Sequence, residues 1–164
     1  MAQEKGGRCR NKFLPAFLPA KLLSGEYPDY NRVIPESSAS NVTLHREELM
    51  HLLRQVALFT PAEGILSSVR FSFLNGEVKL NANAAEVGEG KVSMPVNYHG
   101  PQLDIAFNPL FFLDILRHTN GETVNMGLTD AFNPGVITES ETEPEAEKKP
   151  SSLFILMPMR LNEE

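Results

Sequence analysis

The side chains best suited to covalent chemistry or metal binding are few in this sequence, and they form no recognisable site. Cys9 is the only cysteine, and it stands among basic residues without the ordered neighbouring base that a nucleophile needs. The histidines are His45, His51, His99 and His118. His45 and His51 are six residues apart, whereas two ligands on one helical face need a spacing of about four. We therefore expect no catalytic residue, no metal site and no cofactor.

Phosphate-binding and acid–base patterns are not found either. The glycines of "NGEVKLNANAAEVGEGK" have neither GxGxxG nor Walker spacing. The carboxylates gather in "ESETEPEAEKKPSS", where no apolar pocket would raise a pKa for acid catalysis. We expect a protein that is not an enzyme.

Composition favours one globular domain in a reducing compartment. The chain has 164 residues, of which 41% are hydrophobic and 22% charged, enough for a single sizeable core. Its net charge of −6 argues against a nucleic-acid footprint over the whole surface. No apolar run approaches the roughly 20 residues of a membrane-spanning helix. Because Pro15 and Pro19 also interrupt the N-terminal apolar stretch, we expect no signal peptide, a cytoplasmic location and no membrane partner.

The apolar run from Leu153 to Met159, broken only by Pro158, needs an explanation in an acidic protein. It has about a third of the length of a membrane span, so the anchor interpretation fails. Two interpretations remain, a final core strand and an exposed recognition edge.

Three segments lack the pattern of a packed element. Residues 1–20 hold four basic side chains against one acidic side chain, and we interpret them as a flexible arm, either an extended lead-in or a basic arm that grips phosphates. Residues 21–40 are expected to be an extended connector, since Pro28 and Pro35 oppose a helix. The acidic loop 139–150 is expected to be a solvated insertion, with a docking segment for a basic partner as the alternative.

Two regular elements stand out in the first half of residues 41–164. Leu49, Leu52, Leu53 and Val56 recur at three- and four-residue steps and predict one face of a helix that ends before Pro61. In "SVRFSFLNGEVKLNAN", apolar and polar residues alternate on both sides of Asn-Gly, which predicts a β-hairpin with a two-residue turn.

The second half repeats this order. "KVSMPVNYHG" and "QLDIAFN" are predicted strands, and "NPLFFLDILRHTNG" is a predicted helix with Asn108 as N-cap, Pro109 at its first position and Asn120-Gly121 as its stop. "TVNMGLTD", "GVITES" and "SLFILMP" supply three more strands. The result is a twofold repeat of strand, helix and three strands, an α+β fold in which each unit packs one helix on an antiparallel sheet.

Three segments together resemble one family. "LLSGEYPDYNRVIP", "IAFNPLFFLDIL…VNMGLTD" and the terminal "FILMPMRL" are similar to the C-terminal third of the bacterial DNA polymerase III β subunit, the replicative sliding clamp, over residues 21–161. The resemblance implies a DNA-clamp domain, six of which close a ring around duplex DNA. The family chain holds three such domains and this chain holds one.

The resemblance implies a function for the apolar end of the chain. In the family, the last strand forms part of a cleft that captures short peptide motifs of polymerases and of the clamp loader. One wall of that cleft comes from the preceding domain, so we expect weak binding by this chain alone. The corresponding cleft residues here are Pro28, Arg32, Val33, Asn108, Phe111, Phe132, Pro134, Ile155, Leu156, Met157, Pro158, Met159, Arg160 and Leu161. From alternation alone, about half of residues 153–157 are core instead.

The DNA face and the subunit interface are expected on the helices. Candidate phosphate contacts, which would carry no base specificity, are Arg46, His51, Arg54, Arg117 and His118. Leu58 and Phe59 correspond to the family's subunit interface, and they fit a core position equally well.

The expected function is that of a processivity factor for DNA replication. Its expected partners are duplex DNA, held by encirclement, replicative polymerase and clamp-loader peptide motifs, and other clamp domains or subunits. The alternative is a stand-alone truncated clamp domain that binds peptides without encircling DNA.

Overall fold

The architecture is an α+β domain in which helices cover antiparallel sheets. The computed structural model describes residues 29–35, 37–61, 67–139 and 152–160. In chain order its elements are η1 (Tyr30–Arg32), β1 (Ser40–His45), α1 (Arg46–Ala57), β2 (Val69–Leu74), β3 (Glu77–Ala84), β4 (Gly88–Pro95), β5 (Leu103–Phe107), α2 (Pro109–His118), β6 (Thr123–Leu128), β7 (Gly135–Glu139) and β8 (Leu153–Leu156). The order of strands and helices confirms the predicted twofold repeat.

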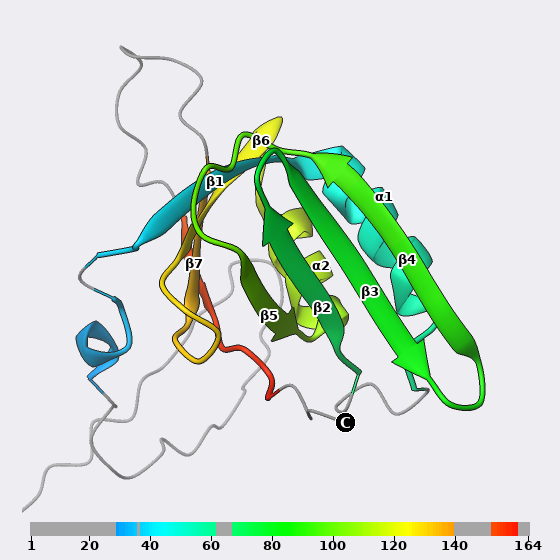
Figure 1. The fold of residues 1–164 in the computed structure, drawn as a ribbon. Coiled ribbons are helices and arrows are strands. Elements are labelled where there is room, and N and C mark those ends of the chain that lie inside the picture. The colour runs from blue at the N-terminus through cyan, green and yellow to red at the C-terminus, as the bar shows by residue number, and fades with distance from the viewer. Residues whose placement is uncertain (1–28, 36, 62–66, 140–151, 161–164) are drawn as a thin grey trace, which may run out of the picture.

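The two repeats exchange their first strands. One sheet has the order β1-β6-β7-β8 and the other has the order β4-β3-β2-β5, with every neighbouring pair antiparallel. Strand β1 therefore pairs with the second repeat, and β5 pairs with the first. Helices α1 and α2 contact each other and lie behind the strands in Figure 1. Because of this exchange, neither repeat completes its sheet alone.

One continuous core joins the helices to both sheets. It includes Leu49 and Leu53 of α1, Phe112 of α2 and inward side chains from all eight strands. Phe71, Phe107 and Phe112 have ring centroids 5.3–5.8 Å apart, a separation typical of favourable aromatic pairs. The shared core fixes α2 against β5, the strand immediately before it.

Local sequence signals explain both helices. The side chain of Asn108 accepts a hydrogen bond from the Leu110 amide at 2.9 Å, as predicted for an N-cap, and Pro109 follows at the first position. Helix α2 ends at His118 with Thr119 as its C-cap, one residue before the predicted stop. Helix α1 buries Leu49, Leu53 and Val56, as its period predicted.

The predicted hairpin is formed by β2 and β3, with Leu74 opposite Glu77. Only Gly76 of the Asn75-Gly76 turn has a positive φ, +80°. The turn therefore uses the glycine for its left-handed position and Asn75 in an ordinary conformation.

Several expectations fall outside the described residues. They concern the basic arm 1–20 with Cys9, the acidic loop beyond Glu139, and Pro28 and Leu161 of the expected cleft. Within the connector, η1 forms one 3₁₀ turn and β1 begins at Ser40, so its described part is not extended throughout. No helix of the described residues is long and apolar enough to cross a membrane.

Candidate functional site

The register of β7 and β8 divides the apolar end of the chain into two faces. Gly135 lies opposite Leu156, and a Cβ atom on Gly135 would meet Phe107 at 3.1 Å, so this pair faces the core. Leu156 is only 6% exposed. The prediction that the Leu156 side chain lines a surface cleft is therefore corrected, because cross-strand partners share a face of the sheet and this one faces inward.

The alternate residues form the opposite face. Ile155 is paired with Val136, and Leu153 lies two residues before it on β8. Met157, immediately after β8, is 59% exposed. Side chains alternate between the two faces of a strand, so Leu153, Ile155 and Met157 follow one another on the outer face. We call these three residues, with Val136, the outer apolar stripe.

A backbone contact brings the end of the chain to the start of α2. The Met159 amide donates a hydrogen bond to the Ala106 carbonyl at 2.8 Å, and these two residues form an isolated bridge. Pro158 has no amide hydrogen to continue pairing, which separates this bridge from strand β8. Ala106 is two residues before Asn108, so the bridge places residues 157–160 beside the first turn of α2, where Phe111 is exposed.

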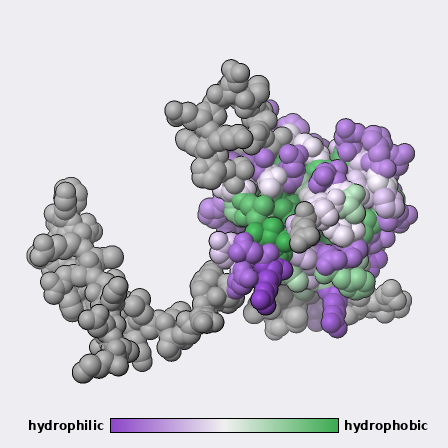
Figure 2. Space-filling view, turned by 90° about the vertical axis from the view of Figure 1, so that its left-hand side faces the viewer, coloured by the Kyte–Doolittle hydropathy of each residue, from purple (hydrophilic) through white to green (hydrophobic). Residues whose placement is uncertain are grey.

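The loop between β6 and β7 reaches the same end of the sheet. Phe132 in this loop is 79% exposed, and Pro134 directly precedes Gly135, the partner of Leu156. Figure 2 looks onto the side where β7 and η1 lie in Figure 1, and it shows a green apolar patch bordered by hydrophilic surface. An exposed apolar patch with a polar rim is typical of a protein-interaction site.

The carboxylate of Asp130 organises this loop. Its Oδ1 accepts hydrogen bonds from the backbone amides of Phe132 and Asn133, and its Oδ2 accepts one from Asn133 Nδ2, all at 2.8 Å. The hydrogen bond from the Phe132 amide has the largest effect on the pKa of Asp130, and the bond from the Asn133 amide has the next largest. Both hold this pKa below its ordinary value. Asp130 therefore fixes the conformation from which the Phe132 side chain projects.

The other predicted cleft residues have different surroundings. Asn108 is buried as the α2 cap, whereas Arg160 is exposed and both Pro158 and Met159 are half-buried. Arg32 is the last residue of the exposed turn η1 and Val33 is its C-cap, and Arg32 Nε is 3.4 Å from Asp29 Oδ2. Within the described residues, the hydrogen bonds of η1 are local and do not tie it to β8 or α2.

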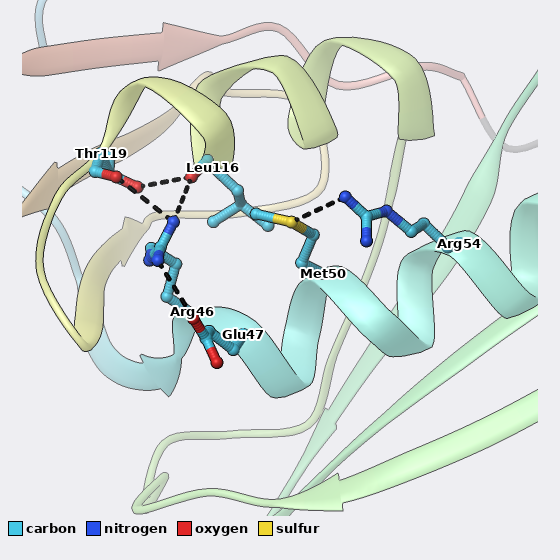
Figure 3. Close-up of polar contacts among 6 residues, drawn as sticks. All are labelled: Arg46, Glu47, Met50, Arg54, Leu116 and Thr119. Atoms are coloured by element: carbon cyan, nitrogen blue, oxygen red, sulfur yellow. Dashed lines mark hydrogen bonds and ion pairs between the residues drawn. The ribbon is translucent and has the colours of Figure 1, made fainter.

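Arg46 occupies a structural position instead of an open DNA-facing one. Its side chain is only 20% exposed, and Nη1 donates to the carbonyls of Leu116 at 3.1 Å and Thr119 at 3.4 Å, at the C-terminal end of α2 (Figure 3). Arg54 by contrast is exposed and reaches Met50 Sδ at 3.1 Å. Arg46 thus joins the start of α1 to the end of α2.

The remaining helix residues proposed to contact DNA are exposed but lie among acidic groups. His51 and Arg117 are exposed, and His118 Nδ1 lies 3.8 Å from Asp114 Oδ1. Glu47 and Glu48 are exposed in the first turn of α1. The helix surface therefore has little net positive charge.

Leu58 and Phe59, for which the sequence left interface and core positions open, have different surroundings in the structure. Leu58 is 73% exposed at the end of α1. Phe59 packs on the core and covers Gly90 of β4 so closely that a Cβ there would lie 2.3 Å from its ring. The outer edges of β1 and β4 have no strand partner among the described residues.

Other parts of the described chain offer no better site. A hollow of about 480 Å³ lies over β3 and β4, but its Lys79 and Lys91 pair with Glu77 and Glu89 at 3.4 and 2.7 Å. No three His, Cys, Asp or Glu side chains of the described residues are arranged to hold a metal ion. The sequence patterns did not point to Val136 or Asp130, although the alternation of "GVITE" was sufficient to place Val136 and Ile137 on different faces of their strand.

Comparison with known proteins agrees with the fold. The family model described as "DNA polymerase III beta subunit, C-terminal domain" matches residues 31–152. The chain is 54% identical over 147 residues to the beta sliding clamp of Chlamydia pneumoniae, covering 90% of this chain and 37% of that protein. It is 32% identical over 142 residues to the clamp of Haemophilus influenzae, covering 87% and 36%.

A solved structure shows the same arrangement in space. The sliding clamp of Pseudomonas aeruginosa bound to griselimycin superposes with a TM-score of 0.76 at 30% identity, over 87% of this chain and 36% of that one. The chain thus spans little more than a third of the length of the relatives it matches. The matched family model and the shared fold show that this chain belongs to the DNA polymerase III beta subunit family, the sliding clamps, through the C-terminal domain of that family.

Proposed function

We propose that this domain serves DNA replication as part of a sliding clamp and that its outer apolar stripe binds peptide motifs of a polymerase or clamp loader. The observation that carries the proposal is that Met157, Phe132 and Phe111 are all exposed, and that the strand register and the Ala106–Met159 bridge bring their segments to one end of the β1-β6-β7-β8 sheet. These exposed side chains come from three separate segments. Methionine and aromatic side chains are common in interaction surfaces, because they offer large apolar contact areas.

The domain acts in a ring and not as an isolated DNA-binding protein. The mixed charges of the helix surface support this proposal, since they predict weak affinity for phosphates. Encirclement holds a clamp on DNA without strong contacts. Neighbouring clamp domains join at the unpaired edges of β1 and β4. The exposed Leu58 belongs to the β4 side, because the next residue, Phe59, covers Gly90 of β4.

Griselimycin is a suitable probe for the apolar stripe, because it is bound in the structure of the Pseudomonas aeruginosa clamp. Isothermal titration would compare the wild-type chain with Met157→Asp and with the matched control Val87→Asp. Val87 is also exposed, at 54%, but lies between β3 and β4. A carboxylate at position 157 should weaken binding at least tenfold, which corresponds to about 1.4 kcal/mol. Equal affinities of the two variants, or no binding by the wild type at millimolar concentration, would contradict the proposed site.

Ring formation has a separate test. Leu58→Asp should reduce the fraction of the chain that associates with a full-length clamp, as measured by gel filtration, because it places a charge at the domain edge. Leu110→Asp is the matched control, since Leu110 is also exposed but lies on α2, which packs against β8, and not on α1, which packs against β4. An association that both variants retain would contradict the proposed edge and favour a stand-alone peptide-binding module.

A further inference from the structure

Phe132 projects into solvent without the packing that normally holds an aromatic ring in place. Its side chain is 79% exposed, and it is not among the side chains that pack against the core. An exposed ring keeps a defined position only if the backbone beneath it is fixed. The polar contacts of loop 130–134 therefore decide where this ring lies.

One carboxylate supplies those contacts. Asp130 accepts three hydrogen bonds of 2.8 Å, two from the consecutive amides of Phe132 and Asn133 and one from the Asn133 side chain. Bonds to an ionised acceptor are stronger than bonds between neutral groups. The loop enters β7 through Pro134, whose φ is restricted, so it is held at one end by Asp130 and at the other by the sheet.

We propose that Asp130 is a positioning residue for the peptide site formed by the outer apolar stripe and Phe132. Asp130 holds loop 130–134 in one conformation, so that Phe132 meets a ligand without prior ordering of the loop. This inference rests on the proposed function of that stripe. Asp130 does not itself touch the ligand in this arrangement. Its contribution to affinity is the conformational freedom that the loop has already lost before binding.

The two carboxylate oxygens allow a graded test. Asp130→Asn keeps an acceptor oxygen for the two backbone amides, and loses the negative charge and the bond to Asn133 Nδ2. Asp130→Ala loses all three bonds. Glu89→Ala is the matched control, because Glu89 is likewise an exposed carboxylate held by hydrogen bonds, from Lys91 and Asn81, on the other sheet.

The measurement is the affinity for griselimycin by isothermal titration, in the wild-type background and with Phe132→Ala. We expect Asp130→Ala to weaken binding five- to tenfold, Asp130→Asn less than twofold and Glu89→Ala not at all. In the Phe132→Ala background, Asp130→Ala should have no further effect, because the ring that it positions is gone. A general loss of stability would instead weaken binding equally in both backgrounds.

Amide hydrogen exchange gives a second readout that needs no ligand. The amides of Phe132 and Asn133 should exchange faster in Asp130→Ala and stay protected in Asp130→Asn. If Phe132→Ala weakens binding but Asp130→Ala does not, the inference is wrong and the proposed site stands. If the wild type and both Asp130 variants all fail to bind griselimycin, the proposed function and this inference fall together.

Discussion

The contact between Arg46 and the end of α2 makes a quantitative prediction about stability. The Arg46 guanidinium donates to the Leu116 carbonyl at 3.1 Å and to the Thr119 carbonyl at 3.4 Å, while only 20% of its side chain is exposed. The first distance is that of a normal hydrogen bond and the second is long. The positive charge also lies where the dipole of α2 is negative.

The magnitude follows from these contacts. A hydrogen bond to a charged group is worth roughly 1.5–3 kcal/mol, and the long second bond adds little. The buried Nε of Arg46 has no hydrogen-bond partner among the described residues, and the cost of burying it reduces the net stabilisation by about 1 kcal/mol. Thr119 Oγ1 donates to the Leu116 carbonyl at 3.0 Å, so this carbonyl keeps one hydrogen bond after Arg46 is replaced. Arg46→Met should therefore lower the free energy of unfolding by about 1–2 kcal/mol, or lower Tm by roughly 3–7 °C.

Arg54→Met is the matched control, since it removes the same charge and side-chain shape from the exposed face of the same helix. Its loss should stay within about 0.5 kcal/mol, as for most surface substitutions. Thermal unfolding followed by circular dichroism at several salt concentrations measures both. An Arg46→Met chain that melts with the wild type would refute the assignment and return Arg46 to the candidates for phosphate contact.

Three further outcomes are expected. Gly90→Ala should displace the Phe59 ring, since the new Cβ would lie 2.3 Å from it. This should lower the free energy of unfolding by about 1–3 kcal/mol in urea titrations. Gly76→Ala, where there is open space but φ is +80°, should lower it by about 1 kcal/mol through backbone strain alone. Met159→Pro removes the donor of the 2.8 Å bond to Ala106 and should cost about 1 kcal/mol, whereas Met159→Ala keeps that bond; equal losses would contradict the bridge. Folding lowers the pKa of Asp130, so the ionised carboxylate stabilises the fold fully at pH values above its ordinary pKa of 3.8. This stabilisation is lost as the pH falls through the lower pKa of the folded state. An NMR titration midpoint at or above 3.8 would contradict the three hydrogen bonds.

Local signals were sufficient for most of the elements. The helix periods, the Asn108 cap and the Asn75-Gly76 turn each depend on residues close in sequence, and the structure confirms them. The partners of β1 and β5 lie in the other repeat, which no local pattern reveals. Arg46 shows the same limit, because its acceptors are 70 and 73 residues away and its spacing on α1 resembles that of an exposed basic residue.

The apolar end of the chain shows why a site is harder to predict than an element. The alternation in "LFILM" predicts two sets of side chains, one for the core and one for the surface, but it does not say which set is which, because both are apolar. The assignment depends on register, since a shift by one residue exchanges the faces. Gly135 fixes that register: Phe107 fills the space where its side chain would be, so its partner Leu156 faces the core and Ile155 faces outward. A glycine on β7 thus determines which residues of β8 are available to a ligand.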